Sequence, residues 1–117
     1  MCKVRACLID YPDYELCHCG EITKVKGPKW WRGTVSQHKG NGEGHFKVHL
    51  QSRYGKRDHV WVHRVICAAF HGTPPVYDDK EAEVRHLDDD PGNNHANNLR
   101  WGSRTENERD KWRSNTH

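Results

Sequence analysis

Three side chains in the C-terminal half have the types that metal-assisted hydrolysis uses: one imidazole and two carboxamides. His86 lies in a predicted strand, Asn98 begins a second strand, and Asn107 falls near the first turn of a predicted helix. If the strands pair and the helix crosses them, the three can meet. A neutral imidazole can take a proton from water, while a divalent cation held by Asn107 polarises a phosphate ester. Oxygen ligands favour Mg²⁺ or Mn²⁺ over zinc.

The elements that would position these residues follow from the hydrophobic pattern. A short strand is expected over 84–87, a turn-rich loop over 88–97, and a second strand over 99–101. Ser103 with Glu106 three residues later forms a capping box, which predicts a final helix to about residue 113. The order strand, loop, strand, helix places the three polar side chains on one compact unit.

The preceding half of the chain reads as β structure followed by one helix. Apolar residues alternate with polar ones on both sides of a turn, which predicts a hairpin over 45–63. Val65, Ile66, Ala69 and Phe70 then share a helical face, and a Gly-Thr-Pro-Pro run ends that helix. A strand is expected over 21–26, while residues 1–12 show no clear period and 76–83 read as an acidic linker. The fold class is α+β, with a β-rich module at 1–60 and a catalytic region at 61–117 that together form one compact unit.

Charge is distributed unevenly along the 117 residues. The net charge is only +3, but residues 18–64 hold 10 basic and 3 acidic residues, and 78–90 hold 7 acidic residues. Such asymmetry favours a basic surface for a polyanion beside an acidic site, although an acidic run is more often a solvated loop. Phosphate contacts would give salt-dependent affinity for double-stranded DNA. The basic residues expected to make them are Lys24, Lys26, Lys29, Arg32, Arg53, Lys56, Arg57 and Arg104. Trp30 and Trp31 could stack on bases, but the packing interpretation, one inward and one outward, is preferred.

Other classes of protein fit less well. No apolar run approaches the roughly 20 residues of a membrane span, and no signal-peptide core follows Met1, so a cytoplasmic protein is expected. An odd number of cysteines disfavours a disulfide framework. Cys67 lies on the apolar helix face and is expected in the core. A zinc-stabilised interaction domain built on Cys2, Cys7, Cys17 and Cys19 stays an alternative, with a spacing at 17–19 unlike that of zinc knuckles.

The segment VRHLDDDPGNNHANNLRWGSRTENERD, residues 84–110, resembles the catalytic motif of HNH endonucleases, the ββα-metal class. Residues 60–75 resemble the stretch that precedes this motif in phage and intron-encoded members, and 12–26 resemble a small module found N-terminal to such nucleases. The resemblance implies that His86 is the general base, that Asn98 orders the loop and helps orient that histidine, and that Asn107 is a metal ligand.

Arg85 departs from the family pattern. Many members have Asp or Asn before the catalytic histidine as a second metal ligand, and this chain has a cation there. Arg85 could contact the phosphate or stabilise charge in the transition state. Asp88, Asp89 and Asp90 are expected mainly to make the turn. A non-catalytic DNA-binding module therefore remains a second alternative.

The resulting expectation is a small metal-dependent DNA endonuclease of phage or mobile-element origin, acting in a bacterial host. A single site per chain fits nicking of one strand, unless a homodimer presents two sites.

Overall fold

The computed structural model describes residues 4–40, 44–77, 80–103 and 105. The N-terminal part is a four-stranded antiparallel sheet in the order β1-β2-β3-β4, with the short 3-10 helix η1 before its last strand. Its elements are β1 (Arg5–Leu8), β2 (Tyr11–Cys17), β3 (Ile22–Lys24), η1 (Lys29–Trp31) and β4 (Gly33–Thr34).

A three-stranded antiparallel sheet and an α-helix come next. The sheet runs β5-β6-β7, and β6 pairs with β7 from Lys47 opposite Trp61 to Gln51 opposite Arg57. The chain enters the helix directly from β7, and Gly72 with φ of 83° follows the helix C-terminus, where a left-handed residue is favoured. The elements are β5 (His38–Lys39), β6 (Phe46–Gln51), β7 (Arg57–Trp61) and α1 (Val62–His71).

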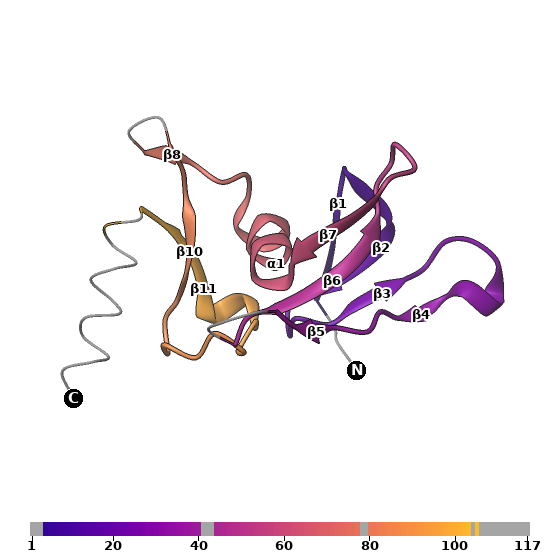
Figure 1. Ribbon diagram of the computed structural model, residues 1–117, viewed down its shortest axis with the longest axis horizontal. Helices are drawn as coiled ribbons and strands as arrows, with labels where there is room; N and C mark the ends of the chain where they lie inside the picture. The colour runs from indigo at the N-terminus through magenta and orange to yellow at the C-terminus, as the bar shows by residue number, and fades with distance from the viewer. Residues whose placement is uncertain (1–3, 41–43, 78–79, 104, 106–117) are drawn as a thin grey trace.

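The remaining described strands form two small hairpins. In the second of them, β10 and β11 pair antiparallel with His86 opposite Leu99, and the loop between them ends in a 3-10 turn. In Figure 1 this hairpin lies at one end of the molecule and the β3–β4 connection at the other, with α1 between them. The elements are β8 (Val76–Tyr77), β9 (Lys80–Glu81), β10 (Glu83–His86), η2 (Ala96–Asn98) and β11 (Leu99–Gly102).

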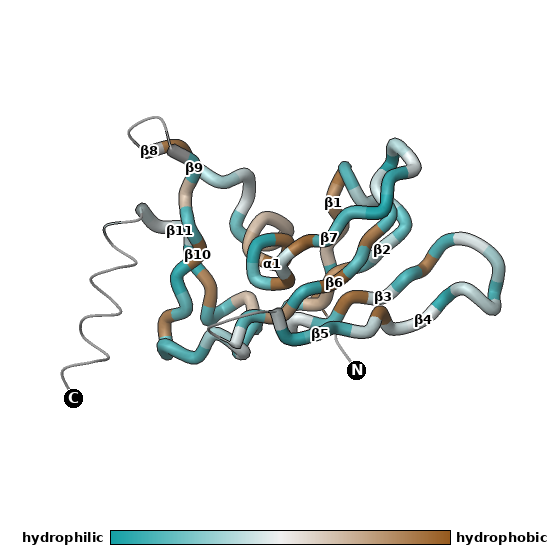
Figure 2. Tube along the Cα trace, in the orientation of Figure 1, coloured by the Kyte–Doolittle hydropathy of each residue, from teal (hydrophilic) through white to brown (hydrophobic). Residues whose placement is uncertain are grey.

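One apolar cluster connects these parts. Leu16 and Ile22 of the first sheet, Leu50 of the second, Ile66 of α1 and Leu99 of β11 are fully buried members of it. Hydrophobic stretches of α1, β3 and β6 are brown in Figure 2 and lie in the middle of the trace. Burial of apolar area at roughly 25 cal/mol per Å² makes this shared cluster the main force that holds the β10–β11 hairpin to the N-terminal sheets.

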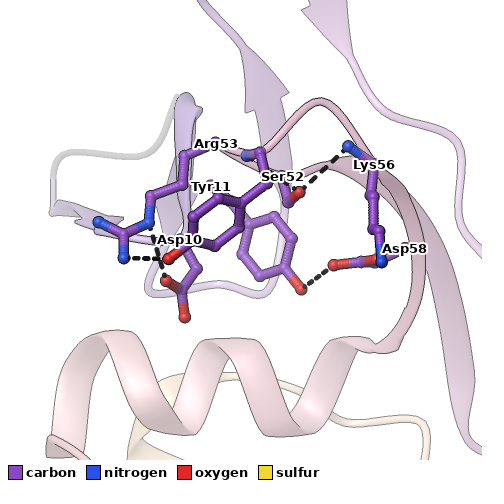
Figure 3. A network of polar contacts seen from close by, with 7 residues as sticks. Asp10, Tyr11, Ser52, Arg53, Lys56 and Asp58 are labelled. Carbon is purple, nitrogen blue, oxygen red and sulfur yellow. Dashed lines mark hydrogen bonds and ion pairs between the residues drawn. The ribbon is translucent and has the colours of Figure 1, made fainter.

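The turns of the two N-terminal hairpins are also tied together by polar contacts (Figure 3). The Tyr11 hydroxyl donates to Asp58 Oδ2 over 3.0 Å, and burial together with this carboxylate raises the pKa of Tyr11 to about 12. Arg53 donates its backbone N–H to the Asp10 carbonyl over 2.8 Å and pairs with the Asp10 carboxylate at 3.6 Å. The β1–β2 and β6–β7 turns therefore form one structural unit.

Most predicted elements are present. The hairpin over 45–63, the helix ending at His71, the strand within 21–26 and the two strands around the turn-rich loop are confirmed, as is a buried Cys67. One expectation about the elements is wrong, because the acidic stretch expected to be a linker contains the β8–β9 hairpin. Residues 5–8 and 11–12, which show no clear period, belong to strands. In both places cross-strand pairing stabilises short strands that have no clear apolar period. The helix expected after Ser103 lies outside the described residues, among which no helix is long and apolar enough to span a bilayer.

Candidate active site

His86 is the last residue of β10, and its ring faces the core side of the hairpin with Val84. Alternate residues of a strand share a face. His63 at the start of α1 has its ring centre 5.5 Å from that of His86, and the ring of His45 lies 5.4 Å from His86 and 4.4 Å from His63. Three imidazoles from three separate parts of the chain therefore gather at the end of β10.

The His86 ring is held by Asn94, a residue that the sequence did not single out. The Nε2–H of His86 donates to Asn94 Oδ1 over 3.2 Å, and Asn94 is only 6% exposed. With the proton on Nε2, the lone pair for accepting another proton is on Nδ1. The sequence did hold a signal for this contact. Asn94 belongs to the Asx-rich run that follows His86, and a polar side chain in such a run can fold back to form a hydrogen bond with the histidine.

Burial sets the protonation state of these histidines. Desolvation lowers the pKa of His86 below its usual 6.5, although the Asn94 hydrogen bond and the carboxylates of Asp88 and Asp90 oppose the shift. The pKa of His63 falls to about 3, chiefly by desolvation, and its buried Nδ1 has no hydrogen-bond partner among the described residues. At neutral pH His86 is an uncharged imidazole, the form that can act as a base.

Asn98 orders the loop and does so through Asp88. Its Oδ1 accepts from the Asp88 N–H over 2.9 Å, and its Nδ2 donates to Asp88 Oδ1 and to the Asn93 carbonyl over 2.8 and 3.0 Å. The side-chain hydrogen bond of His86 is with Asn94 rather than Asn98, so Asn98 is connected to that histidine only through the loop.

Asp88 is the centre of the loop. Its carboxylate accepts from Asn93 Nδ2 at 2.8 Å and from the Asp90 N–H at 2.9 Å, as well as from Asn98. These hydrogen bonds lower the pKa of Asp88. The positive φ of 62° at Asp89 belongs to the same tight turn. The acidic residues after His86 therefore build the turn, as their types predict.

The N-terminal module supports this loop directly. The Ala96 N–H donates to the His18 carbonyl over 2.6 Å, and the His18 and His95 rings meet edge to face. Gly20, at φ of 99°, lies so close that a Cβ would be 3.0 Å from the Asn94 carbonyl oxygen. The turn after β2 is thus part of the wall behind Asn94.

Arg85 occupies the opposite face of β10 from His86. Its side chain crosses Gly102 of β11, where an added Cβ would fall 2.2 Å from Arg85 Cδ. A side chain at 102 would therefore force Arg85 to leave this path. A phosphate contact by Arg85 would have to be made from that face of the hairpin.

The described residues do not by themselves make a metal site. Among residues 4–40, 44–77, 80–103 and 105, no three His, Cys, Asp or Glu side chains are arranged to hold a metal ion. The oxygens of Asp88 are already occupied by the loop. Asn107, the predicted ligand, and Cys2 of the zinc alternative lie outside the described residues. Cys17 is disulfide-bonded, so it is not a thiolate ligand and the four-cysteine zinc site is not formed, although its sulfur lies 3.0 Å from that of the free Cys19.

The predicted DNA-contacting residues differ in their surroundings. Lys26, Lys29, Arg32, Lys56 and Arg57 are exposed, and Arg53 is engaged with Asp10 and the Tyr54 ring. Lys24 is 9% exposed, and its Nζ lies 3.7 Å from the centre of the Trp31 ring, so its charge is held against an aromatic face. Arg104 lies outside the described residues.

Comparison with known proteins agrees with this geometry. Residues 60–109 match the HNH endonuclease family. A solved structure described as DNA binding and cleavage by the HNH homing endonuclease I-HmuI superposes with a TM-score of 0.67 at 23% identity, over 89% of this chain. The chain spans 54% of the length of that protein. No curated protein matches the sequence.

Proposed function

We propose, from the match of residues 60–109 to the HNH endonuclease family, that this chain hydrolyses phosphodiester bonds in double-stranded DNA. The observation that supports it most is the neutral, oriented imidazole of His86, held by Asn94 on a loop ordered by Asn98 and Asp88. Homing, as in the structural neighbour, is a finer proposal that the nuclease activity alone does not require.

His86 would activate the attacking water. Its Nε2–H is fixed on Asn94, so Nδ1 accepts the proton as the water oxygen attacks phosphorus. Because burial lowers the pKa of His86, the ring stays available as a base at neutral pH. The centres of the His45 and His63 rings lie 5.4 and 5.5 Å from that of His86.

A divalent cation, Mg²⁺ or Mn²⁺, is part of the proposal. When bound it would stabilise negative charge on the phosphate and leaving oxygen. Since the described residues supply no complete ligand set, the ion would depend on Asn107 together with phosphate and water oxygens. The proposal that Asn107 is a ligand rests on its position in the family motif.

The exposed cations of the β3–β4 connection and of the β6–β7 turn would bind the DNA backbone. Lys29 and Arg32 lie on the first, and Lys56 and Arg57 on the second. Their affinity would be salt-dependent and largely independent of sequence.

Plasmid relaxation tests the nuclease proposal. Purified protein is incubated with supercoiled plasmid and Mg²⁺ or Mn²⁺, with and without EDTA, and the formation of nicked circles is followed. We expect relaxed circles only with free metal, and their loss in His86→Ala. His38→Ala, which removes an exposed histidine on β5, is the matched control and should retain activity.

The outcomes separate the alternatives. Plasmid binding with no metal-dependent relaxation that His86 controls would favour a non-catalytic DNA-binding module. Linear product at early times would indicate a dimer with two sites.

A further inference from the structure

The connection between β3 and β4 projects from the sheet at the end of the molecule remote from β10 and β11 (Figure 1). This segment, residues 26–32, is called the Trp arm below. Trp30 is 81% exposed and Trp31 is 51% exposed, both on η1. The packing interpretation of the pair is therefore wrong, because a 3-10 turn does not point successive side chains to opposite sheet faces as a strand does.

The Trp arm is held in one conformation by short-range contacts. The Trp31 N–H donates to the Pro28 carbonyl over 2.8 Å, and Arg32 Nε donates to the Gly27 carbonyl over 2.8 Å. Lys24 lies against one face of Trp31, and Gly27, at φ of 102°, leaves only 3.3 Å between an added Cβ and the Trp31 ring. Trp31 is thus an anchor, and Trp30 is presented to solvent beside it.

A groove of about 520 Å³ runs between the Trp arm and the β6–β7 hairpin. Volumes of roughly 300–1,000 Å³ are typical of small-ligand sites, which is enough for a nucleotide. Trp31, Lys24 and Tyr14 lie on one side, and His49, Gln51 and Arg57 lie on the other. None of the described residues that line it is acidic, and Arg32 adds a further cation.

Aromatic faces surrounded by cations are the chemistry that binds single-stranded nucleic acid. Bases stack on exposed aromatic rings and the phosphates contact Lys or Arg, whereas paired bases in a duplex keep their faces covered by their neighbours. Trp30 offers an uncovered ring, and Arg32 and Arg57 flank the groove. The side chains Gln51 and Thr34 provide hydrogen-bonding groups within it.

We propose that the Trp arm and its groove bind an unpaired stretch of the DNA substrate, with a base stacked on Trp30 and its phosphates between Arg32 and Arg57. This rests on the proposed function in that DNA is the substrate. It adds that the protein binds DNA opened or distorted away from the cut, because the Trp arm and the β10–β11 hairpin lie at opposite ends of a molecule 50 Å long. At 3.4 Å per step that length covers about 15 base pairs.

The test measures the affinity of the His86→Ala protein for different DNAs. Metal is left out, and the substitution also keeps the DNA intact. Three DNAs are used: a paired duplex, the same duplex with an internal run of unpaired thymidines, and oligothymidylate alone. Binding is measured by fluorescence anisotropy of labelled DNA. Trp30→Ala in the same background should weaken binding of the two DNAs with unpaired bases about 5- to 100-fold and leave the paired duplex within about twofold.

Two matched variants distinguish stacking from charge. Trp30→Phe keeps an aromatic face and should restore most of the lost affinity. Lys29→Ala removes a neighbouring charge and should weaken all three DNAs by a similar factor. Because Trp30 is exposed, its replacement should leave the melting temperature unchanged, which thermal unfolding verifies.

An equal loss on all three DNAs, or no loss on any, would overturn the proposal. A protein that fails to relax plasmid but still discriminates through Trp30 would contradict the nuclease function and retain this binding site. A protein that cleaves plasmid but whose DNA affinity does not depend on Trp30 would support the nuclease function and contradict this binding site.

Discussion

Replacing Asn94 changes the one side-chain hydrogen bond that the proposed base makes within the described part of the chain. The Asn94 amide oxygen accepts from His86 Nε2 over 3.2 Å and stabilises the protonated ring relative to the neutral one. Asn94→Ala removes the acceptor, and Asn94→Asp replaces it with a carboxylate. The two variants should therefore move the pKa of His86 in opposite directions, down for alanine and up for aspartate.

The expected changes in rate and pKa follow from the strength of the hydrogen bond between Asn94 and His86. A net neutral hydrogen bond is worth about 0.5–1.5 kcal/mol, so loss of orientation in Asn94→Ala should lower the cleavage rate at pH 7.5 by about 2- to 12-fold. A carboxylate within hydrogen-bond distance raises the pKa of a histidine by about 1–3 units. Because the neutral ring is the active form, the rate falls as pH drops through the pKa of His86. That limb lies below pH 6.5 in the native protein and should rise by at least about 1 pH unit in Asn94→Asp.

Two assays measure this. The pH dependence of kcat/KM for plasmid nicking locates the ionisation in the free enzyme. Titration of the histidine Cε1–H resonances by NMR, with the His86 signal assigned from its loss in His86→Gln, reports the pKa without DNA or metal.

Asn97, three residues after Asn94 in the sequence, offers a matched control. It is exposed, so Asn97→Asp adds the same charge and Asn97→Ala removes the same amide without touching the His86 ring. Both should leave the pKa of His86 within about 0.3 units, given screening at an exposed position. If Asn94→Asp and Asn97→Asp shift it equally, or if neither shifts it, Asn94 does not orient His86 and the reasoning is wrong.

Three further perturbations follow from the structure. Lys56→Ala with Arg57→Ala should weaken duplex binding and lower the slope of log affinity against log salt by up to about 2, whereas an unchanged slope would place the DNA elsewhere. Asn98→Ala loses three loop hydrogen bonds and should lower the free energy of unfolding in urea by about 2–4 kcal/mol, with Asn97→Ala nearly silent. The pKa of His63 is about 3 in the folded protein against 6.5 unfolded, so its stabilising effect is complete above pH 6.5 and lost as pH falls toward 3, by at most about 1.4 kcal/mol per unit. His63→Phe should flatten that slope in urea unfolding at pH 7.5, 6 and 5, and an unchanged slope would show that His63 is not buried neutral.

Local patterns predicted the elements that carry strong periodicity. Phe46, Val48 and Leu50 alternate with polar residues, and the apolar face of α1 repeats at helical spacing, so both formed where the sequence indicates. The strands at 5–8 and 76–77 lack such a pattern because they depend on partners elsewhere in the chain. The surroundings of Trp30 and Trp31 could not be predicted for a related reason, since adjacent aromatic residues give no period by which a 3-10 turn differs from a strand.

The sequence by itself determined the β10–β11 hairpin: a histidine at the end of one strand, an Asx-rich turn, and an asparagine that returns to its beginning. These are contacts between residues close in the chain, and local hydrogen-bonding preferences specify them. Only the tertiary structure decided what surrounds His86. The His63 and His45 rings, and the β2–β3 turn behind Asn94, arrive from distant segments because one apolar core packs both sheets around α1. Burial by those segments, which no spacing in the sequence encodes, lowers the pKa of His86 and makes it a neutral base.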